Sequence, residues 1–400
     1  MRRDARSEVV ATNRLYYQDC YLTEFPAQAE ETVEDARKVY LESTAFYPTS
    51  GGQPNDLGML GDQCVVDVVD EGDRIAHVLA GPLAPCAVLR GRVDWQRRYD
   101  HMQQHTGQHL LSAVFMNVLK AQTLSFHMGA DVSTIELGLK ELTEAQIDEV
   151  ETQANAIVWE ARPVNISFEN AGSVEGLRKP SERAGELRIV EITGFDRSAC
   201  GGTHVRSTAE LGPIQILRWE KLRGNVRVEF VCGGRALRRA KQEHRILAEL
   251  SRITSTAIPQ IQEYVSSLKD RLAEVEKTQQ RLTSDLARRE GEAAYSNSPL
   301  SPDGLRRSFL EVSAIDDAVR AKSQAFAKLP RAVVLAVGSQ PAGVLIACSP
   351  DCGINAGALL KEVLAQAGGR GGGSAVLAQG GLPSPEVLKQ LRSRLGFEAQ

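Results

Sequence analysis

Two short histidine and cysteine pairs, far apart in the sequence, constrain the fold of this chain more than any other feature. "HTGQH" places His105 and His109 four residues apart at the start of an apolar run, and "CGGTH" repeats that spacing with Cys200 and His204. Four residues are about one helical turn, so His105 and His109 share one face of a helix. The two glycines permit a tight bend between Cys200 and His204. If both pairs bind one metal ion, a helix and a remote loop must meet.

The donor set indicates which metal such a site would hold. Three imidazoles and one thiolate form a suitable tetrahedral set for Zn²⁺, and sulfur with nitrogen disfavours magnesium and calcium. Four protein ligands are typical of a structural zinc, whereas two distant pairs that join a helix to a loop are not typical of a compact structural site. Ligand type alone therefore leaves the structural and catalytic interpretations open. His101, on the same helical face as His105, could replace one ligand.

Composition excludes some classes of partner. The net charge is −4, with 42% hydrophobic and 24% charged residues, which is ordinary for a globular protein and does not favour bulk binding of polyanions. Contacts with nucleic acid would have to come from local basic segments, and the candidates are Arg90, Arg92, Arg97 and Arg98, and the stretch 237–245. Seven scattered cysteines fit a reducing compartment. The N-terminus has no apolar run of signal or membrane length, so we expect a cytoplasmic protein without membrane partners.

The hydrophobic pattern predicts an α+β fold in its first two parts. Residues 1–98 contain short runs of β-branched and aromatic residues cut by Gly, Pro and Asp, among them "CAVLRGRVDW" at 86–95, and predict a β-barrel-like, glycine-rich subdomain. Within it, 47–58 is too rich in Gly, Pro and Asn for regular structure and predicts a long loop. Residues 99–234 predict an α+β zinc domain with helices at 99–120 and 143–161 and near 173–184, and a strand at 164–170.

Two further parts follow. Residues 235–295 predict a helical hairpin or coiled-coil arm, because apolar residues from Ile261 to Leu286 alternate steps of four and three, with Gln279 as the polar interruption. The composition of 290–304 is typical of a linker. Residues 304–400 predict a small α/β domain whose apolar strands at 332–338 and 343–350 should be buried on both faces. The arm or this domain could form a homodimer.

Four ordered motifs carry a resemblance to a known family. "FYPTSGGQPNDLG", "HMQQHTGQHLLSAV", "DRSACGGTHV" and "GNVRVEFVCGGRAL" resemble the editing domain of alanyl-tRNA synthetases, and resemble more closely the free-standing alanyl-tRNA editing proteins of the AlaX type. The tail "GGRGGGSAVLAQGG" resembles the C-terminal DHH-associated domain of the same synthetases, which points to the long AlaX form. The tail departs from the synthetase pattern Gly-Gly-Gly-Arg-Pro followed by an acidic residue, because 371–376 reads "GGGSAV". That difference puts a direct copy of the synthetase tail's RNA contacts in doubt.

The resemblance implies a zinc-dependent hydrolase that removes serine, and also glycine, from mischarged alanine tRNA. Position by position, His105, His109, Cys200 and His204 match the family's zinc ligands, and Gln53 matches the glutamine of its glycine-rich loop. The resemblance includes no aminoacylation region ahead of the barrel, so we expect a protein that deacylates tRNA without charging it.

The expected chemistry is hydrolysis of an ester between an amino acid and a ribose hydroxyl. Zinc could activate water and polarise the carbonyl, or it could hold the substrate's amino group or ribose while the loop orients water. A site built to hydrogen-bond the serine hydroxyl would discriminate against alanine. We expect Gln53, Thr49, His105 and Cys200 to take part in catalysis. The residues expected to contact substrate or tRNA are Gln53, Ser50, His127, Arg92 and Arg97.

Two other functions stay open. One is a non-catalytic tRNA-binding protein with a structural zinc. The other is an editing enzyme for a different mischarged tRNA, because threonyl-tRNA synthetases carry a related domain. The glycine-rich barrel and the tail favour alanine tRNA over the second alternative.

Overall fold

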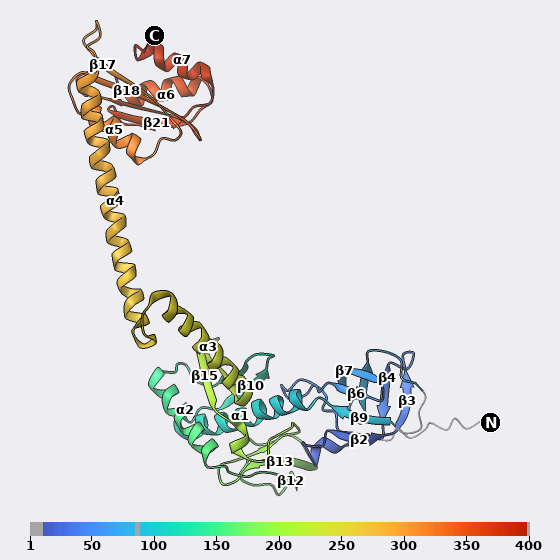
Figure 1. The fold of residues 1–400 in the computed structure, drawn as a ribbon. Coiled ribbons are helices and arrows are strands. Elements are labelled where there is room, and N and C mark those ends of the chain that lie inside the picture. The colour runs from blue at the N-terminus through green and yellow to red at the C-terminus, as the bar shows by residue number, and fades with distance from the viewer. Residues whose placement is uncertain (1–10, 85–88, 398–400) are drawn as a thin grey trace. The chain divides into compact units, whose positions relative to one another are not determined.

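A computed structural model describes residues 11–84 and 89–397 of the chain, and Figure 1 shows their path. The chain divides into two compact units, with the boundary between Glu249 and Leu250. The structure confirms the expected mixture of helices and sheets. No described helix is both long enough and apolar enough to cross a membrane.

The first unit begins with a nearly closed antiparallel sheet. Among the described residues it has seven strands in the order β2-β9-β6-β7-β8-β4-β3. These strands are β2 (Glu24–Ala27), β3 (Ala29–Val33), β4 (Lys38–Leu41), β6 (Gly58–Leu60), β7 (Gln63–Asp70), β8 (Ile75–Leu79) and β9 (Leu89–Val93). Alternate side chains point inward, as in β9, and their core includes Phe25, Leu41 and Phe46. The strand predicted for 86–95 is described only from Leu89, and Cys86 lies outside the described residues.

Short elements lie before the first strand of this sheet and between β4 and β6. They are the parallel pair β1 (Asn13–Arg14) and β5 (Ser43–Thr44), and a 3₁₀ turn, η1 (Leu15–Tyr17). Between β5 and β6, residues 47–57 form the predicted loop, with only an isolated bridge between Ser50 and Gln53.

A long buried helix, α1 (Trp95–Leu119), is the centre of the first unit. It begins four residues before the predicted start because the Asp94 side chain caps it and accepts a hydrogen bond from the Arg97 backbone N–H. Every residue from His101 to Phe115 is buried. The elements around it are the sheet β10 (Thr123–Met128), β11 (Ser133–Leu137), β16 (Asn225–Cys232) and β15 (Ile214–Leu222), and helix α2 (Glu144–Trp159). Complete burial explains why charged residues are absent from 101–115.

A small antiparallel sheet forms the other side of the first unit. Its strands are β12 (Val164–Asn170), β13 (Glu186–Ile192) and β14 (Asp196–Ala199), followed by η2 (Thr208–Leu211). The helix predicted near 173–184 is wrong, because the segment 171–185 contains no helix. Gly172, Gly176 and Gly185 and the proline at 180 interrupt it, and Gly176 and Gly185 adopt positive φ angles that end regular helix.

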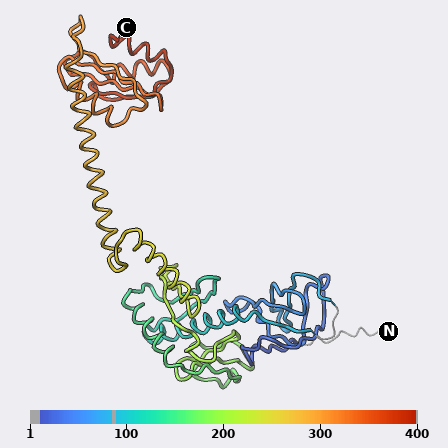
Figure 2. Tube along the Cα trace, in the orientation of Figure 1, coloured from blue at the N-terminus to red at the C-terminus, as the bar shows by residue number. Residues whose placement is uncertain are grey.

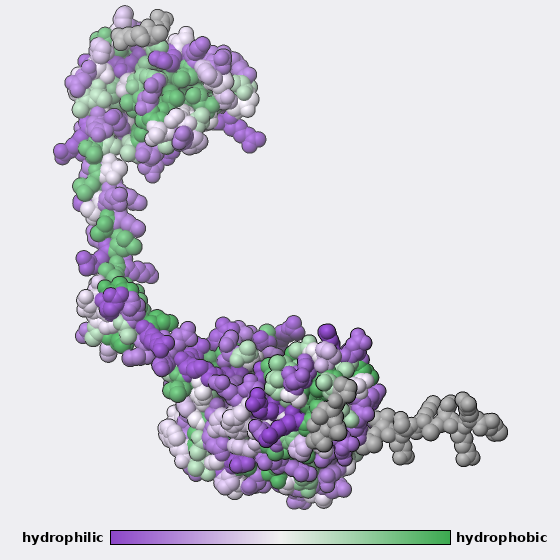
Figure 3. All heavy atoms as spheres, turned by 45° about the vertical axis from the view of Figure 1, so that its right-hand side comes forward, coloured by the Kyte–Doolittle hydropathy of each residue, from purple (hydrophilic) through white to green (hydrophobic). Residues whose placement is uncertain are grey.

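Two helices follow: α3 (Gly233–Thr254), and then, after the turn η3 (Ile258–Gln260), α4 (Ile261–Asn297). The linker predicted at 290–304 is wrong in its first half, because α4 continues to Asn297. The end of α4 packs against α5 (Asp317–Ala327), where Gly291 approaches the backbone of Lys322 so closely that a Cβ would clash. This contact stabilises helix where composition alone indicates a break. In Figure 3, apolar side chains are visible along the exposed part of α4.

The rest of the second unit is a small domain around a mixed sheet, traced in Figure 2. Its described strands run in the order β17-β18-β19-β21-β20, and only β17 and β18 are parallel. These strands are β17 (Arg306–Val312), β18 (Ala332–Ser339), β19 (Ala342–Cys348), β20 (Gly371–Gly373) and β21 (Leu377–Gly381). Helices α6 (Ala356–Gln366) and α7 (Pro385–Arg394) share a core with one face, and Phe326 of α5 packs on the other. The predicted burial of β18 and β19 on both faces is confirmed.

Candidate metal centre and cavity

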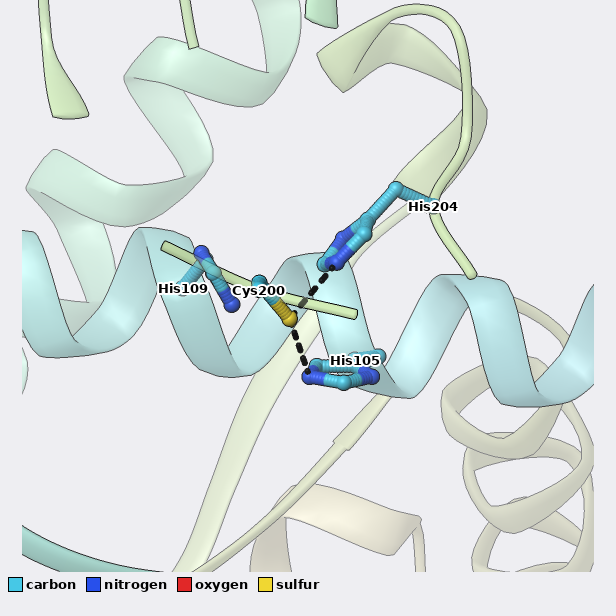
Figure 4. Close-up of side chains that lie close together, drawn as sticks. All are labelled: His105, His109, Cys200 and His204. Carbon is cyan, nitrogen blue, oxygen red and sulfur yellow. Dashed lines mark hydrogen bonds between the residues drawn. The ribbon is translucent and has the colours of Figure 1, made fainter. Parts of the chain in front are cut away.

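The two sequence pairs converge. His105 and His109 come from α1, and Cys200 and His204 come from the loop after β14, yet one potential ligand atom from each residue lies within 4.8 Å of the others. The Cys200 Sγ is 3.4 Å from Nε2 of His105 and 3.4 Å from Nε2 of His204, and Figure 4 marks both contacts. A helix and a remote loop therefore present four donors to a common point.

These distances fit a tetrahedral metal site. With Zn–S near 2.3 Å and Zn–N near 2.0–2.1 Å, tetrahedral angles place sulfur and nitrogen ligands about 3.5 Å apart. The observed 3.4 Å separations are close to that value. The cluster of three imidazoles and one thiolate thus suits Zn²⁺ in both ligand chemistry and spacing.

Each imidazole has a polar neighbour on its Nδ1 side. The Oε1 of Gln53 is 2.7 Å from Nδ1 of His105, and the Oγ1 of Thr106 is 3.1 Å from Nδ1 of His204. Asp196 Oδ2 is 3.5 Å from Nδ1 of His109, which is an ion-pair distance rather than a hydrogen bond. Because an amide oxygen only accepts, His105 carries its proton on Nδ1 and leaves Nε2 for a metal. Such contacts fix the tautomer and orientation of metal-binding histidines.

Electrostatics in the cluster favour a thiolate. Burial opposes ionisation of Cys200, but the imidazoles of His105, His204 and His109 outweigh it and lower the thiol pKa well below its ordinary value. Burial lowers the pKa of His204 to about 3. Burial also acts against charge on His109, but Cys200 and Asp196 together raise its pKa to about 9. A stabilised thiolate is the form of cysteine that binds metals.

Two glycines permit the close approach of these segments. A Cβ on Gly202 would lie 2.2 Å from Cε1 of His105, so a side chain in "CGGTH" would displace the imidazole. A Cβ on Gly107 would lie 2.2 Å from Sγ of Cys232, so the glycine of "HTGQH" lets β16 pack directly on α1. Gly107 and Gly202 therefore leave no room for a side chain, because a Cβ at either position would clash with the neighbouring segment.

A cavity of about 590 Å³ opens beside the cluster. His105, His109, Cys200 and Gly202 form one wall, and Ser50 and Gly51 of the 47–57 loop line it as well. The volume is within the range of sites that bind small molecules. Three of the four grouped donors, His105, His109 and Cys200, therefore border space that a ligand could occupy.

The structure places the predicted loop residues differently from one another. Gln53 is fully buried and bonded to His105 and to Thr203, so it positions the His105 imidazole and is not part of the cavity lining. Ser50 does line the cavity, whereas Thr49 is outside the lining and shares hydrogen bonds with Asn55. His127 is an exposed residue of β10 and is not part of the cavity lining, whereas its neighbour Phe126 is.

The remaining candidates also lie outside the cluster. His101 is buried but is not among the four grouped donors. Arg92 is exposed on β9, and Arg97 donates to the backbone oxygen of Asn55, so neither lines the cavity. Arg98 is wrong as a surface contact for RNA, because it is completely buried and paired with Asp56.

Sequence reasoning missed several residues of the cavity. Tyr16, Tyr17 and Tyr47 form part of its lining, and Arg188 donates hydrogen bonds to the backbone oxygens of Cys200 and Tyr17. Arg188 thereby fixes the backbone of Cys200. The pattern of hydrophobic residues predicts that tyrosines in 11–24 belong to the core and that an arginine inside β13 is exposed. Only the contact with a distant backbone shows their place in the site.

Comparison with known proteins agrees with this geometry. Residues 187–229 match the family described as the threonyl and alanyl tRNA synthetase second additional domain, and residues 312–396 match the DHHA1 domain. The alanyl-tRNA editing protein Aarsd1-B of Xenopus laevis is 32% identical over 291 residues, which are 67% of this chain and 70% of that protein. Aarsd1 of Mus musculus is 32% identical over 294 residues, with 68% and 71% covered. The alanine–tRNA ligase of Thermococcus kodakarensis is 31% identical over 411 residues, 96% of this chain and 44% of the ligase.

The fold and the matched segments define the class of protein. It combines the second additional domain found in threonyl- and alanyl-tRNA synthetases with a DHHA1 domain. Within that class, the chain belongs to the family of alanyl-tRNA editing proteins of the AlaX type.

Proposed function

We propose that this protein hydrolyses the ester bond of mischarged alanine tRNA in trans, with Ser-tRNA(Ala) and Gly-tRNA(Ala) as substrates and Zn²⁺ as its metal. The observation that carries the proposal is the position of the four-donor cluster, because three of its members, His105, His109 and Cys200, line a cavity of about 590 Å³. The names of the editing-protein relatives support the same activity. Because aminoacylated tRNA is used where translation occurs, we expect the protein to act in the cytoplasm.

The roles of the side chains follow from their contacts. A zinc ion held by the four donors would supply Lewis-acid polarisation of the ester carbonyl. Gln53 orients the His105 imidazole and holds Thr203, so it keeps the barrel loop against the "CGGTH" loop. Ser50 has its backbone bonded to Gln53 and is part of the cavity lining, so we propose its hydroxyl as the partner for a serine hydroxyl. Alanine would leave that partner unpaired, which disfavours its binding.

The four parts of the chain would then have distinct tasks. Residues 1–98 and 99–234 together form the editing site, since the barrel supplies Gln53 and Ser50 and the zinc domain supplies the metal donors. We assign 235–295 to a helical arm and 304–400 to a DHH-associated domain. Arg92 and Arg97 are retained as candidate contacts for RNA outside the cavity.

A panel of mischarged tRNAs tests the function. We expect rapid release of serine, with alanyl-tRNA(Ala) hydrolysed at least about 100-fold more slowly, because loss of a hydrogen-bonded substrate hydroxyl produces differences of that size. Glycyl-tRNA(Ala) and threonyl-tRNA(Thr) complete the panel, and rapid release of glycine would show that small size as well as the hydroxyl admits a substrate. Release of labelled amino acid is the measurement, and spontaneous hydrolysis without protein is the control. Preferred hydrolysis of a threonine tRNA substrate would instead favour the alternative specificity. Tight tRNA binding without any deacylation would favour a non-catalytic protein with a structural zinc.

We also propose that the arm pairs with a second copy of this chain. Six apolar residues of the heptad seam in α4 are each 41–62% exposed, namely Val265, Leu268, Leu272, Val275, Leu282 and Leu286. A stripe of this kind is typical of a coiled-coil interface. With Leu268 and Val275 at d positions, Arg271 and Glu276 occupy successive g and e positions, which face each other across a parallel dimer in register. This opposite charge pairing favours a second parallel copy of α4 as the occupant.

Leu272→Glu is expected to convert the dimer to a monomer, because it places a carboxylate in the seam. Molar mass by size-exclusion chromatography with light scattering is the measurement. Ser266→Glu, on the exposed side of the same helix, should leave the dimer intact. Arg271→Glu should weaken the dimer and the added Glu276→Arg change should restore it, as expected for facing g and e charges. A wild-type protein that is monomeric at high micromolar concentration contradicts the pairing.

A further inference from the structure

A second cavity, of about 480 Å³, adjoins the first. The two share His109, Phe126 and Arg183 in their linings, so they are separated by side chains rather than by backbone layers. Only the first cavity contains His105 and Cys200. The second is therefore a compartment next to the metal cluster that the proposed hydrolysis does not itself require.

The outer wall of the second cavity is basic. Arg178, Lys179 and Arg183, from the irregular segment 171–185, line it together with one acidic residue, Glu182. Arg178 is held in place, because it donates to Asp196 at 2.7 Å and to Ser198 at 2.9 Å. Lys179 and Arg183 are exposed, and neither side chain forms an ion pair or a hydrogen bond with another residue in the described ranges. Two positive charges therefore face this cavity without a partner.

Its floor is apolar and aromatic. Phe126 is half-buried between the two cavities, and Leu124, 46% exposed, lies in the second. Single-stranded nucleic acids are bound by this combination, in which aromatic faces stack with bases and basic side chains contact the backbone phosphates.

We propose that the second cavity binds the nucleotide that precedes the aminoacylated terminal nucleoside of the tRNA, a role that rests on the function proposed above. The ester and terminal nucleoside occupy the first cavity. The phosphodiester that leaves this nucleoside passes Arg183 at the shared wall. Lys179 contacts the next phosphate, and Phe126 supports the base.

Substrate truncation isolates this subsite. The variant Lys179→Ala/Arg183→Ala is assayed with seryl-tRNA(Ala) and with 3′-O-seryl-adenosine, which carries no phosphate. For the tRNA we expect kcat/KM to fall about tenfold or more, as for loss of hydrogen bonds to a charged group. We expect the slope of log kcat/KM against log salt concentration to become shallower by about 1.4, at about 0.7 for each single-strand phosphate contact. For the nucleoside ester, kcat/KM of the single variant Lys179→Ala should be unchanged, because Lys179 lines only the second cavity.

The matched control removes two positive charges elsewhere in the same unit. Arg218→Ala/Lys221→Ala acts on exposed residues of β15 and should leave both the tRNA rate and the salt slope close to wild type. Equal losses on both substrates would overturn the subsite, because the residues would then act on the ester or on folding. Unchanged rates and slope on tRNA would overturn it too. A wild type inactive on both substrates would refute the proposed function itself, and this assignment with it.

Discussion

Cys200→Ala is expected to lower the rate of seryl-tRNA(Ala) deacylation by at least about 100-fold and to release the zinc. Mutation of a residue that only contacts a metal ligand typically lowers metal affinity or activity 10- to 100-fold. Removal of a sulfur that binds the metal directly should lower them more. The Sγ of Cys200 lies 3.4 Å from the Nε2 atoms of both His105 and His204. Zinc content by mass spectrometry and single-turnover deacylation are the two measurements.

Cys64→Ala is the matched control, because Cys64 is an exposed cysteine on the barrel. It should retain both the metal and the rate. Circular dichroism distinguishes loss of the site from loss of the fold in the Cys200 variant. A folded Cys200→Ala protein that loses zinc and still deacylates at the wild-type rate would contradict a catalytic metal and favour a structural one.

Asp56→Ala is expected to destabilise the first unit by about 3–5 kcal/mol, the usual cost of removing one partner from a buried ion pair. Asp56 and Arg98 are both fully buried and paired. Asp56 also accepts from the backbone N–H of Tyr47 at 2.7 Å, so it closes the loop that carries Ser50 and Gln53. All three tryptophans lie before residue 250, so their fluorescence in urea reports the unfolding of this unit.

Glu24→Ala provides the comparison, because Glu24 forms an exposed pair with Arg90 on the same barrel. Exposed pairs contribute about 1 kcal/mol or less, so this variant should unfold close to the wild type. If Asp56→Ala were as stable as Glu24→Ala, the buried pair would not be what fixes the loop.

The convergence of the four candidate donors could be predicted from the sequence because their spacing carries geometric information. A four-residue step on a helix fixes a shared face for His105 and His109, and the second pair supplies the chemically matching half. The role of Gln53 could not be predicted in the same way. Its partners, His105 and Thr203, are distant in sequence, so only the folded chain shows that it positions an imidazole instead of facing a substrate.

Other predictions failed where a tertiary contact decides. The run of arginines before α1 gives no signal that Arg98 is buried, because its partner Asp56 lies in a separate loop. The 290–304 segment has the composition of a linker, but packing against α5 extends α4 to Asn297. Conversely, helical periodicity near 173–184 was outweighed by glycines with positive φ angles. The local sequence pattern sets a preference for helix, strand or loop. Long-range contacts contribute free energies of similar size and can therefore override that preference.

Gln53, Thr106 and Asp196 hold the three imidazoles from a barrel loop, from α1 and from β14. Residues 187–229, the segment that matches the synthetase family, contain only two of the four donors. High-affinity zinc binding would therefore need the first unit to be folded as a whole. The bound ion would in turn stabilise that unit against unfolding. At a free zinc concentration 100 times the dissociation constant, this linkage amounts to about 2.7 kcal/mol. Cellular zinc supply would then govern how long each molecule survives, as well as whether it can react.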